Sequence, residues 1–146
     1  MPRVKFGSLS LEAPSEWTLQ AVILAGPPNA ESDPSQAFQR NLITTFDFVG
    51  PDETAQSYLK RQNDGLEAAH IERNAVGAPE VVHLEGGAEG LLTEQVVLGQ
   101  TGQFVRQMQL LVVKDGIAHS LIASHLDGAP FEAARDQFRR MLLSFR

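Results

Sequence analysis

The feature that most constrains the fold is a run of strand-like segments in the second half of the chain. "EVVHLEG", "AEGLLTEQVVLG", "GQFVRQMQLLVVKDG" and "IAHSLIASHLDG" are rich in β-branched and aliphatic residues, a composition typical of strands. They are separated by Gly86–Gly87, residues 99–102 and Asp115–Gly116. An Asp-Gly pair between two apolar runs is a strong hairpin signal. The pattern therefore predicts a meander of four antiparallel strands.

The first half of the chain predicts three further strands and one helix. "VKFGSLSLEAP" alternates with a slip at Gly7–Ser8, which indicates a bulge or tight turn, and Trp17 to Ala25 form a second apolar run. Residues 26–38 hold three prolines and predict a loop. "NLITTFDF" predicts the third strand. Asp52 is placed to cap the helix that follows, on which apolar residues recur at helical spacing.

The last segment, "APFEAARDQFRRMLLSFR", predicts a second helix with a wide apolar stripe. Pro130 suits its first turn, and Phe138 lies at the centre of the stripe. Arg135, Arg139 and Arg140 fall on the other side, where we expect solvent. Together these elements predict an α+β fold in a single domain over residues 1–146: a twisted, largely antiparallel sheet with two helices packed on one face.

Charge and composition exclude several classes of function. The net charge of -6 disfavours nucleic acids and anionic membrane surfaces as partners. The chain has no cysteine, so it has no thiolate chemistry. The N-terminus lacks the apolar region of a signal peptide, and no run reaches the ~20 apolar residues of a membrane helix. We therefore expect a cytoplasmic protein that does not insert into a membrane.

Residues able to do chemistry do not form a recognisable site. The four histidines lack a metal-binding spacing. Ser120 and Ser124 have no surrounding nucleophile motif, and the glycine-containing segments match no phosphate-binding loop. The scattered glutamates predict a solvated rim. We expect no enzymatic activity, no cofactor and no metal.

Alternation along the strands indicates a mixed sheet face instead. In "QFVRQMQLLVV" the even-numbered residues are the more apolar set and are assigned to the core, whereas the odd-numbered residues combine amides with aliphatics. A broad face of this kind is typical of an interaction site. A dimer seam, or a face covered by the 26–38 loop, would give the same pattern. The predicted binding residues are Gln20, Val22, Leu24, Ile43, Thr45, Gln107, Gln109, Leu111, His119 and Leu121.

Three loose motifs, taken in order, resemble one family. "GSLSLEAPSEW" is similar to the opening "G-x-x-x-L-P-x-x-W", with Trp17 in place. "FQRNLITTFDFVGPDETAQSYLKRQNDGLEAA" has a strand, an acidic break and a helix with Tyr58, Gln62 and Leu66 at matching positions. "QFVRQMQLLVVKDGIAHSLIASH" is similar to an amide-containing hairpin. Over most of its length the chain thus resembles the DcrB-related proteins, which include the Eag chaperones of type VI secretion.

The resemblance implies a PsbP-like fold and a chaperone function. Eag chaperones bind the apolar N-terminal transmembrane segments of effectors such as Rhs toxins, keep them soluble for loading, and commonly act as homodimers. The chain lacks the signal and lipid-bearing cysteine of DcrB itself, which favours the chaperone branch. The implied partners are a secreted effector and a second copy of the chain. The alternative is a non-enzymatic interaction module on the same scaffold that binds a folded protein.

Overall fold

The computed structural model describes residues 3–6, 9–12, 14–15, 21–25, 38–99 and 102–146. Within these ranges, strands and helices follow in the order β1 (Arg3–Phe6), β2 (Leu9–Glu12), β3 (Ala21–Ala25), β4 (Asn41–Phe48), α1 (Ala55–Ala68), β5 (Arg73–Ala75), β6 (Glu80–His83), β7 (Glu89–Leu98), β8 (Phe104–Lys114), β9 (Ile117–Leu126) and α2 (Ala129–Leu143).

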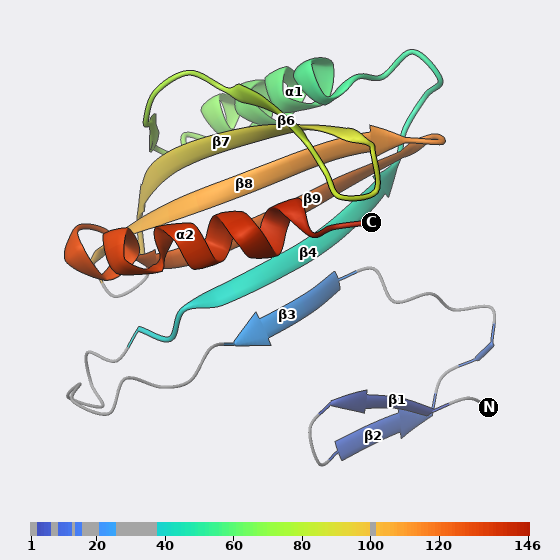
Figure 1. Cartoon of the computed structure of the whole chain (residues 1–146), viewed down its shortest axis with the longest axis horizontal. Coiled ribbons are helices and arrows are strands. Elements are labelled where there is room, and N and C mark those ends of the chain that lie inside the picture. Colours follow the sequence, from blue (N-terminus) through green and yellow to red (C-terminus); the bar gives the residue numbers. More distant parts are fainter. Residues whose placement is uncertain (1–2, 7–8, 13, 16–20, 26–37, 100–101) are drawn as a thin grey trace.

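The described strands form a two-stranded sheet and a seven-stranded antiparallel sheet (Figure 1). The larger sheet has the order β3-β4-β9-β8-β7-β5, and β6 pairs with β7 beside β5. The predicted meander is confirmed, because β6, β7, β8 and β9 pair in succession. Asp115 and Gly116 have φ angles of 53° and 74°, the left-handed pair that the tight hairpin turn requires.

Three local features differ from the sequence prediction. The segment predicted as a single first strand contains two, β1 and β2, which pair with each other in a sheet of their own. The short strand β5 was not expected, because "RNA" has no apolar alternation; it forms by pairing with Gln95 to Val97 of β7. The cap of α1 is Thr54 rather than Asp52. Its side chain accepts a hydrogen bond from the Ser57 backbone N–H at 3.1 Å. Asp52 lies in the turn before the helix, since Glu53 N–H donates to the Gly50 carbonyl.

The two helices lie on opposite faces of the sheet (Figure 1). On one face α2 packs Phe138 and Leu142 against Leu110 of β8. On the other face α1 packs Tyr58 against Leu111, the next residue of the same strand. Successive strand residues point to opposite faces, so β8 is covered on both sides. The α+β fold and the antiparallel sheet are confirmed, but the placement of both helices on one face was wrong.

The error has a physical origin in the apolar run of β8. Leu110, Leu111 and Val112 are all buried. Such an unbroken run is typical of a strand that is covered on both faces, whereas alternation was used to assign one face to the core and the other to a partner. The odd-numbered set also contains Gln107 and Gln109, and these amides gave no sign that a second helix, α1, covers this face.

Ion pairs fix α2 to the far strands of the sheet. Arg135 contacts Glu94 of β7, and Arg139 contacts Glu80 of β6 at 2.8 Å. Half-exposed pairs of this kind stabilise a fold only modestly. They do set the orientation of α2, so these two arginines are engaged with the sheet rather than directed only to solvent as the sequence suggested.

Replacing Phe138 with alanine tests the docking of α2. The side chain is 3% exposed and contacts Phe131, so the change should lower the free energy of unfolding by about 3–5 kcal/mol. Met141→Ala, on the exposed side of the same helix, is the control and should lose far less. Urea denaturation measures both. A loss below ~1 kcal/mol for Phe138→Ala would show that α2 is not docked.

Candidate functional site

A row of isoleucines crosses the sheet face on which α1 packs, in the half of that face that α1 leaves uncovered. We call this face the α1 face and the opposite one the α2 face. Ile23 of β3 pairs with Ile43 of β4, which pairs with Ile122 of β9. Ile23 is 67% exposed and Ile43 is 37% exposed, while Ile122 is half-buried. The helix α1 covers β7 and β8 on this face, and the row begins where that cover ends. Branched apolar side chains at the surface in one line are unusual unless something binds them.

Small side chains lie on either side of the row. On one side Thr45 pairs with Ser120, and on the other side Asn41 pairs with Ser124. Both serines are buried, and Ala25 continues the second line onto β3. Short side chains beside long ones let the backbone of a partner approach closely. We name this surface the isoleucine trough: Ile23, Ala25, Asn41, Ile43, Thr45, Ser120, Ile122 and Ser124.

The helix α1 lies beside the isoleucine trough and is held in place by polar contacts. Tyr58 donates a hydrogen bond to Asp47 at the end of β4. Burial, reinforced by Asp47, raises the pKa of Tyr58 to about 12. Gln109 of β8 donates to Gln62 of α1 at 3.2 Å and to Ser120 at 3.0 Å. These contacts anchor α1 over β8 and keep it from sliding across the isoleucines.

The predicted binding residues divide between the two faces. Ile43, Thr45, Gln107, Gln109 and Leu111 share the α1 face. Leu24, His119 and Leu121 belong to the α2 face, because their partners are Leu42, Val112 and Leu110. Val22 is in register with Thr44, and Gln20 lies outside the described residues. The single mixed face predicted from the sequence was therefore wrong for β9 and for the end of β3.

Burial divides the five residues that do share a face. Gln109 and Leu111 are 2% and 0% exposed beneath α1. Gln107 is half-buried and accepts a hydrogen bond from Gln95 at 2.7 Å. Ile43 and Thr45 remain at the surface. The accessible part of the predicted site is thus the part on β4, beside α1.

Six residues of the trough were missed by the sequence prediction: Ile23, Ala25, Asn41, Ser120, Ile122 and Ser124. The signal for Ile122 was present in the Asp-Gly turn. A two-residue turn pairs Lys114 with Ile117, so odd-numbered residues of β8 face even-numbered residues of β9. Matching odd with odd shifts the register by one residue, and such a shift reverses every side chain.

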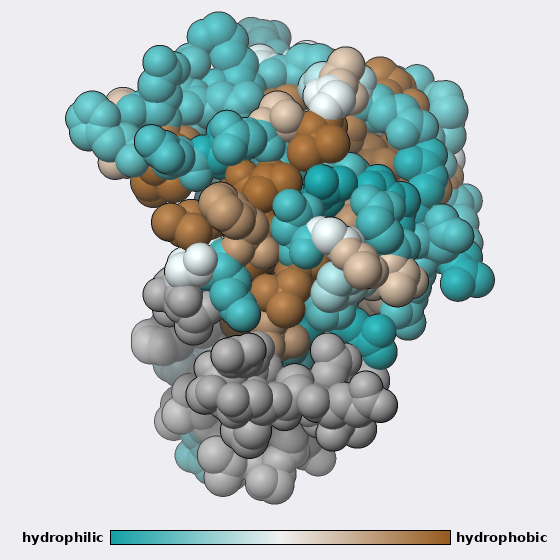
Figure 2. Space-filling view, turned by 90° about the vertical axis from the view of Figure 1, so that its left-hand side faces the viewer, coloured by the Kyte–Doolittle hydropathy of each residue, from teal (hydrophilic) through white to brown (hydrophobic). Residues whose placement is uncertain are grey.

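Other exposed apolar side chains lie away from the trough. Figure 2 looks at the end of the molecule where β7 turns into β8, and it shows hydrophobic surface gathered between hydrophilic flanks. Leu98 and Phe104 are exposed cross-strand partners at this end. Phe48, at the other end of β4, is also exposed. Leu98 and Phe104 form one pair across two strands, whereas the isoleucines are adjacent across three strands.

Two further features were sought among the described residues: a cluster of metal-binding side chains and a helix able to span a membrane. In the part of the chain that the structure describes, three or more His, Cys, Asp or Glu side chains nowhere gather in a way that would hold a metal ion. Among the described residues, neither helix combines the length and the apolar character needed to cross a bilayer.

Comparison with known proteins identifies the fold. Neither a protein-family model nor a curated protein matches the chain. The crystal structure of PA94 from Pseudomonas aeruginosa, described as a protein of unknown function and a candidate regulator, matches with a TM-score of 0.69 at 14% identity, over 100% of this chain and 96% of that chain. PsbP (CyanoP) from Synechocystis sp. PCC 6803 matches with a TM-score of 0.55 at 10% identity, over 93% and 97%.

The fold is PsbP-like. The fold implied by the family resemblance is confirmed. Identities this low establish the fold alone, because one scaffold carries many functions. Membership in the DcrB-related family stays a prediction.

Tyr58→Phe tests the anchor of α1. The pKa of Tyr58 is raised from 10.0 to about 12 in the folded chain, so the folded state holds the phenol proton more tightly than the unfolded state. The free energy of unfolding should fall as the pH rises from 10 towards 12. The fall should be smaller in the variant. Denaturation at several pH values measures it, and equal falls would contradict the assignment. Since Tyr58 is the single tyrosine, absorbance reads its ionisation directly.

Leu111→Asp tests which residues are core and which are surface. An aspartate at this fully buried position would be an unpaired buried charge, and we expect a loss above about 4 kcal/mol or no folded protein. Ile43→Asp, two strands away on the same face, should lose much less because its side chain reaches solvent. Circular dichroism and urea denaturation compare the two. Similar losses would place Ile43 in the core.

Proposed function

We propose that this chain is a non-enzymatic chaperone that shelters an apolar transmembrane helix of a secreted effector, in the manner of the Eag chaperones of type VI secretion. The observation that supports the proposal is the isoleucine trough, an accessible apolar row with small neighbours beside an anchored helix. A PsbP-like scaffold with such a surface suits a protein-interaction module. The effector class rests on the family resemblance.

The spacing of the trough matches a docked helix. Packed helices lie about 8–10 Å apart, and neighbouring strands lie about 4.8 Å apart. Because α1 contacts β8 and β7, a client helix two strands away from β8 would lie over β4. It would then contact α1 on one side and the isoleucines below. The client would extend a layer that the chain itself fills only in part.

The chemistry of the trough suits an apolar helix. Burying the exposed isoleucines against client side chains removes apolar surface from water, which gains on the order of 1–2 kcal/mol for each residue. Thr45 and Asn41 supply polar groups next to the row. Such groups satisfy the serine, threonine and amide side chains that transmembrane helices use to recognise one another.

The length of the trough favours two copies for each client. Five residues of β3 pair with β4, which corresponds to roughly 17 Å along the strands. A transmembrane helix of about 20 residues is about 30 Å long. One chain therefore covers little more than half of the helix, and a homodimer would cover it all. The proposal places this step in the cytoplasm, before secretion.

Co-expression with an apolar helix tests the proposal. The probe is a segment of about 20 leucine and alanine residues at the N-terminus of a soluble carrier. Size exclusion with light scattering should show a soluble complex that contains two copies of this chain. Ile43→Asp should abolish the complex, because a charge in the row repels the apolar client. Val81→Asp, on β6 and 53% exposed, is the matched control and should retain it.

Two outcomes would count against the proposal. If the probe aggregates while the wild-type chain elutes alone, the trough does not shelter apolar helices. The alternative, a module that binds a folded protein, would then be favoured. If Val81→Asp loses the complex as fully as Ile43→Asp does, binding does not occur at the trough.

A further inference from the structure

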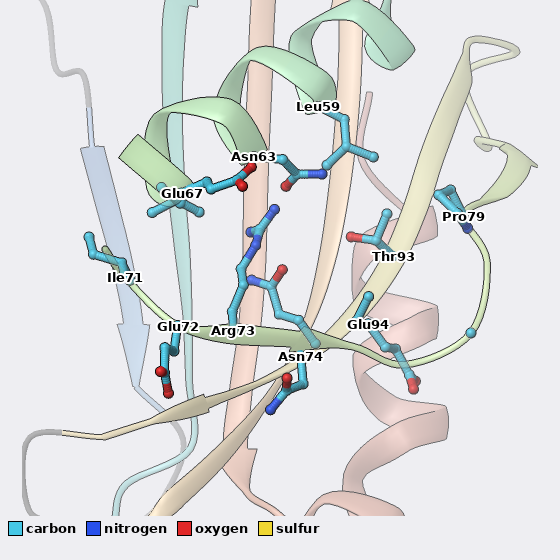
Figure 3. A pocket seen from close by; sticks show the side chains of 14 residues that line it. Leu59, Asn63, Glu67, Ile71, Glu72, Arg73, Asn74, Pro79, Thr93 and Glu94 are labelled. Atoms are coloured by element: carbon cyan, nitrogen blue, oxygen red, sulfur yellow. The ribbon is translucent and has the colours of Figure 1, made fainter. Parts of the chain in front are cut away.

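A cavity lies on the side of α1 away from the isoleucines. It is a cavity of about 620 Å³ between the C-terminal half of α1, the edge strand β5 and strand β7 (Figure 3). Its volume falls in the range of small-molecule sites, about 300–1,000 Å³. Much of its lining is apolar, from Leu59, Leu66, Ile71, Ala75 and Pro79. None of these residues belongs to the isoleucine trough.

Arg73 is the cation of this cavity, and its charge is not neutralised. The side chain comes from β5 and points towards the C-terminal half of α1 (Figure 3). It is half-buried, and burial lowers its pKa. Within the described residues it forms no ion pair. By contrast, each of five other arginines contacts a carboxylate: Arg61, Arg106, Arg135, Arg139 and Arg146.

The nearby carboxylates do not take the place of a partner. Glu94 lines the cavity, but it is paired with Arg135 of α2, and its carboxylate points away from Arg73 (Figure 3). Glu67 and Glu72 are exposed at the rim and make no ion pair with Arg73 at 4 Å or less. A partly desolvated guanidinium without a counter-ion is costly, so a ligand that supplies the anion would be favoured.

Several polar side chains line the cavity. The Asn63 amide lies next to Arg73 in Figure 3, and Asn74 and Gln95 also line the cavity. Thr93, on the wall formed by β7, has a buried Oγ1 with no hydrogen-bond partner in the described part of the chain. An unsatisfied buried hydroxyl costs about 1–3 kcal/mol. A polar ligand atom seated against this wall would give it a partner.

The lining indicates the charge and shape of the ligand. A guanidinium binds planar oxyanions through two parallel hydrogen bonds. The carboxylates of Glu67 and Glu72 at the rim disfavour a dianion such as a phosphate monoester. The apolar wall favours an alkyl or aryl body. We propose that the cavity binds a carboxylate on a short apolar group, with Arg73 pairing with the carboxylate.

Titration with hexanoate tests the site. The NMR chemical shifts of the backbone amides in β5, in β7 and in the C-terminal half of α1 should change when hexanoate is added. They should not move with hexanamide, which has the same body without the charge. Arg73→Gln should weaken hexanoate binding by about tenfold or more, the loss expected for a charge-assisted pair. Arg140→Gln, an exposed arginine on α2, is the matched control and should bind as the wild type does.

A second pair of ligands distinguishes the two possible sources of the carboxylate, a small organic acid and the C-terminus of a polypeptide. A short peptide that ends in leucine with a free carboxylate, compared with its C-terminal amide, asks whether the group comes from a polypeptide end. Binding of the acid form of either ligand, lost in Arg73→Gln, supports the site. The site is wrong if neither acid shifts these amides at millimolar concentration, if hexanamide binds equally well, or if Arg73→Gln binds undiminished while its thermal unfolding is unchanged.

Discussion

The burial of β8 on both faces is the constraint on which the rest of the structure depends. Leu110 faces α2 and Leu111 faces α1, and both are fully buried. A strand in this position needs a helix on each side and a paired strand at each edge, which β7 and β9 supply. From Val105 to Leu111 the backbone of β8 has a strand partner on both edges, as a buried strand requires. The helices follow from the strand, since neither has an apolar face that would be stable alone.

The sheet is wider than the helix α1 that lies on it, and this difference leaves room for both candidate sites. The sheet extends from β5 to β3, but α1 lies mainly over β7 and β8 and reaches β9 and β4 only through Tyr58, which packs on Ala118 and bonds to Asp47. The isoleucine trough opens on one side of α1, and the cavity around Arg73 opens on the other. The polar contacts of Tyr58 and Gln62 hold the helix between them. Any movement of α1 across the sheet would widen one surface and narrow the other.

Local elements were predictable where the chain carries its own signal. The strand β4 came from its β-branched and aromatic residues, and the hairpin at Asp115–Gly116 came from the turn itself. The strand β5 carried no such signal, because three polar residues form a strand only when β7 offers them backbone partners. The cap at Thr54 was missed because the chain turns at Gly50 before the helix starts.

The candidate site was harder to predict because it depends on register. Alternation showed correctly that Ile43 and Gln107 share a face, yet it placed His119 and Leu121 with them. The length of the turn between β8 and β9 would have shown that the even-numbered residues of β9 lie on this face. No local feature reports that Ile23 lies beside Ile43, since residues 26–38 separate the two strands in the chain.

By itself, the sequence determined the number and order of most strands, both helices, the antiparallel meander and the acidic, cysteine-free character of the chain. These properties depend on local preference and composition, which act between neighbours in the chain. The tertiary structure alone decided that α1 and α2 take opposite faces and that three isoleucines meet across β3, β4 and β9. It also decided that Arg73 has no carboxylate partner among the described residues. Each of these results depends on how segments that are distant in the sequence pack together, and close packing fixes that arrangement for the whole sheet at once.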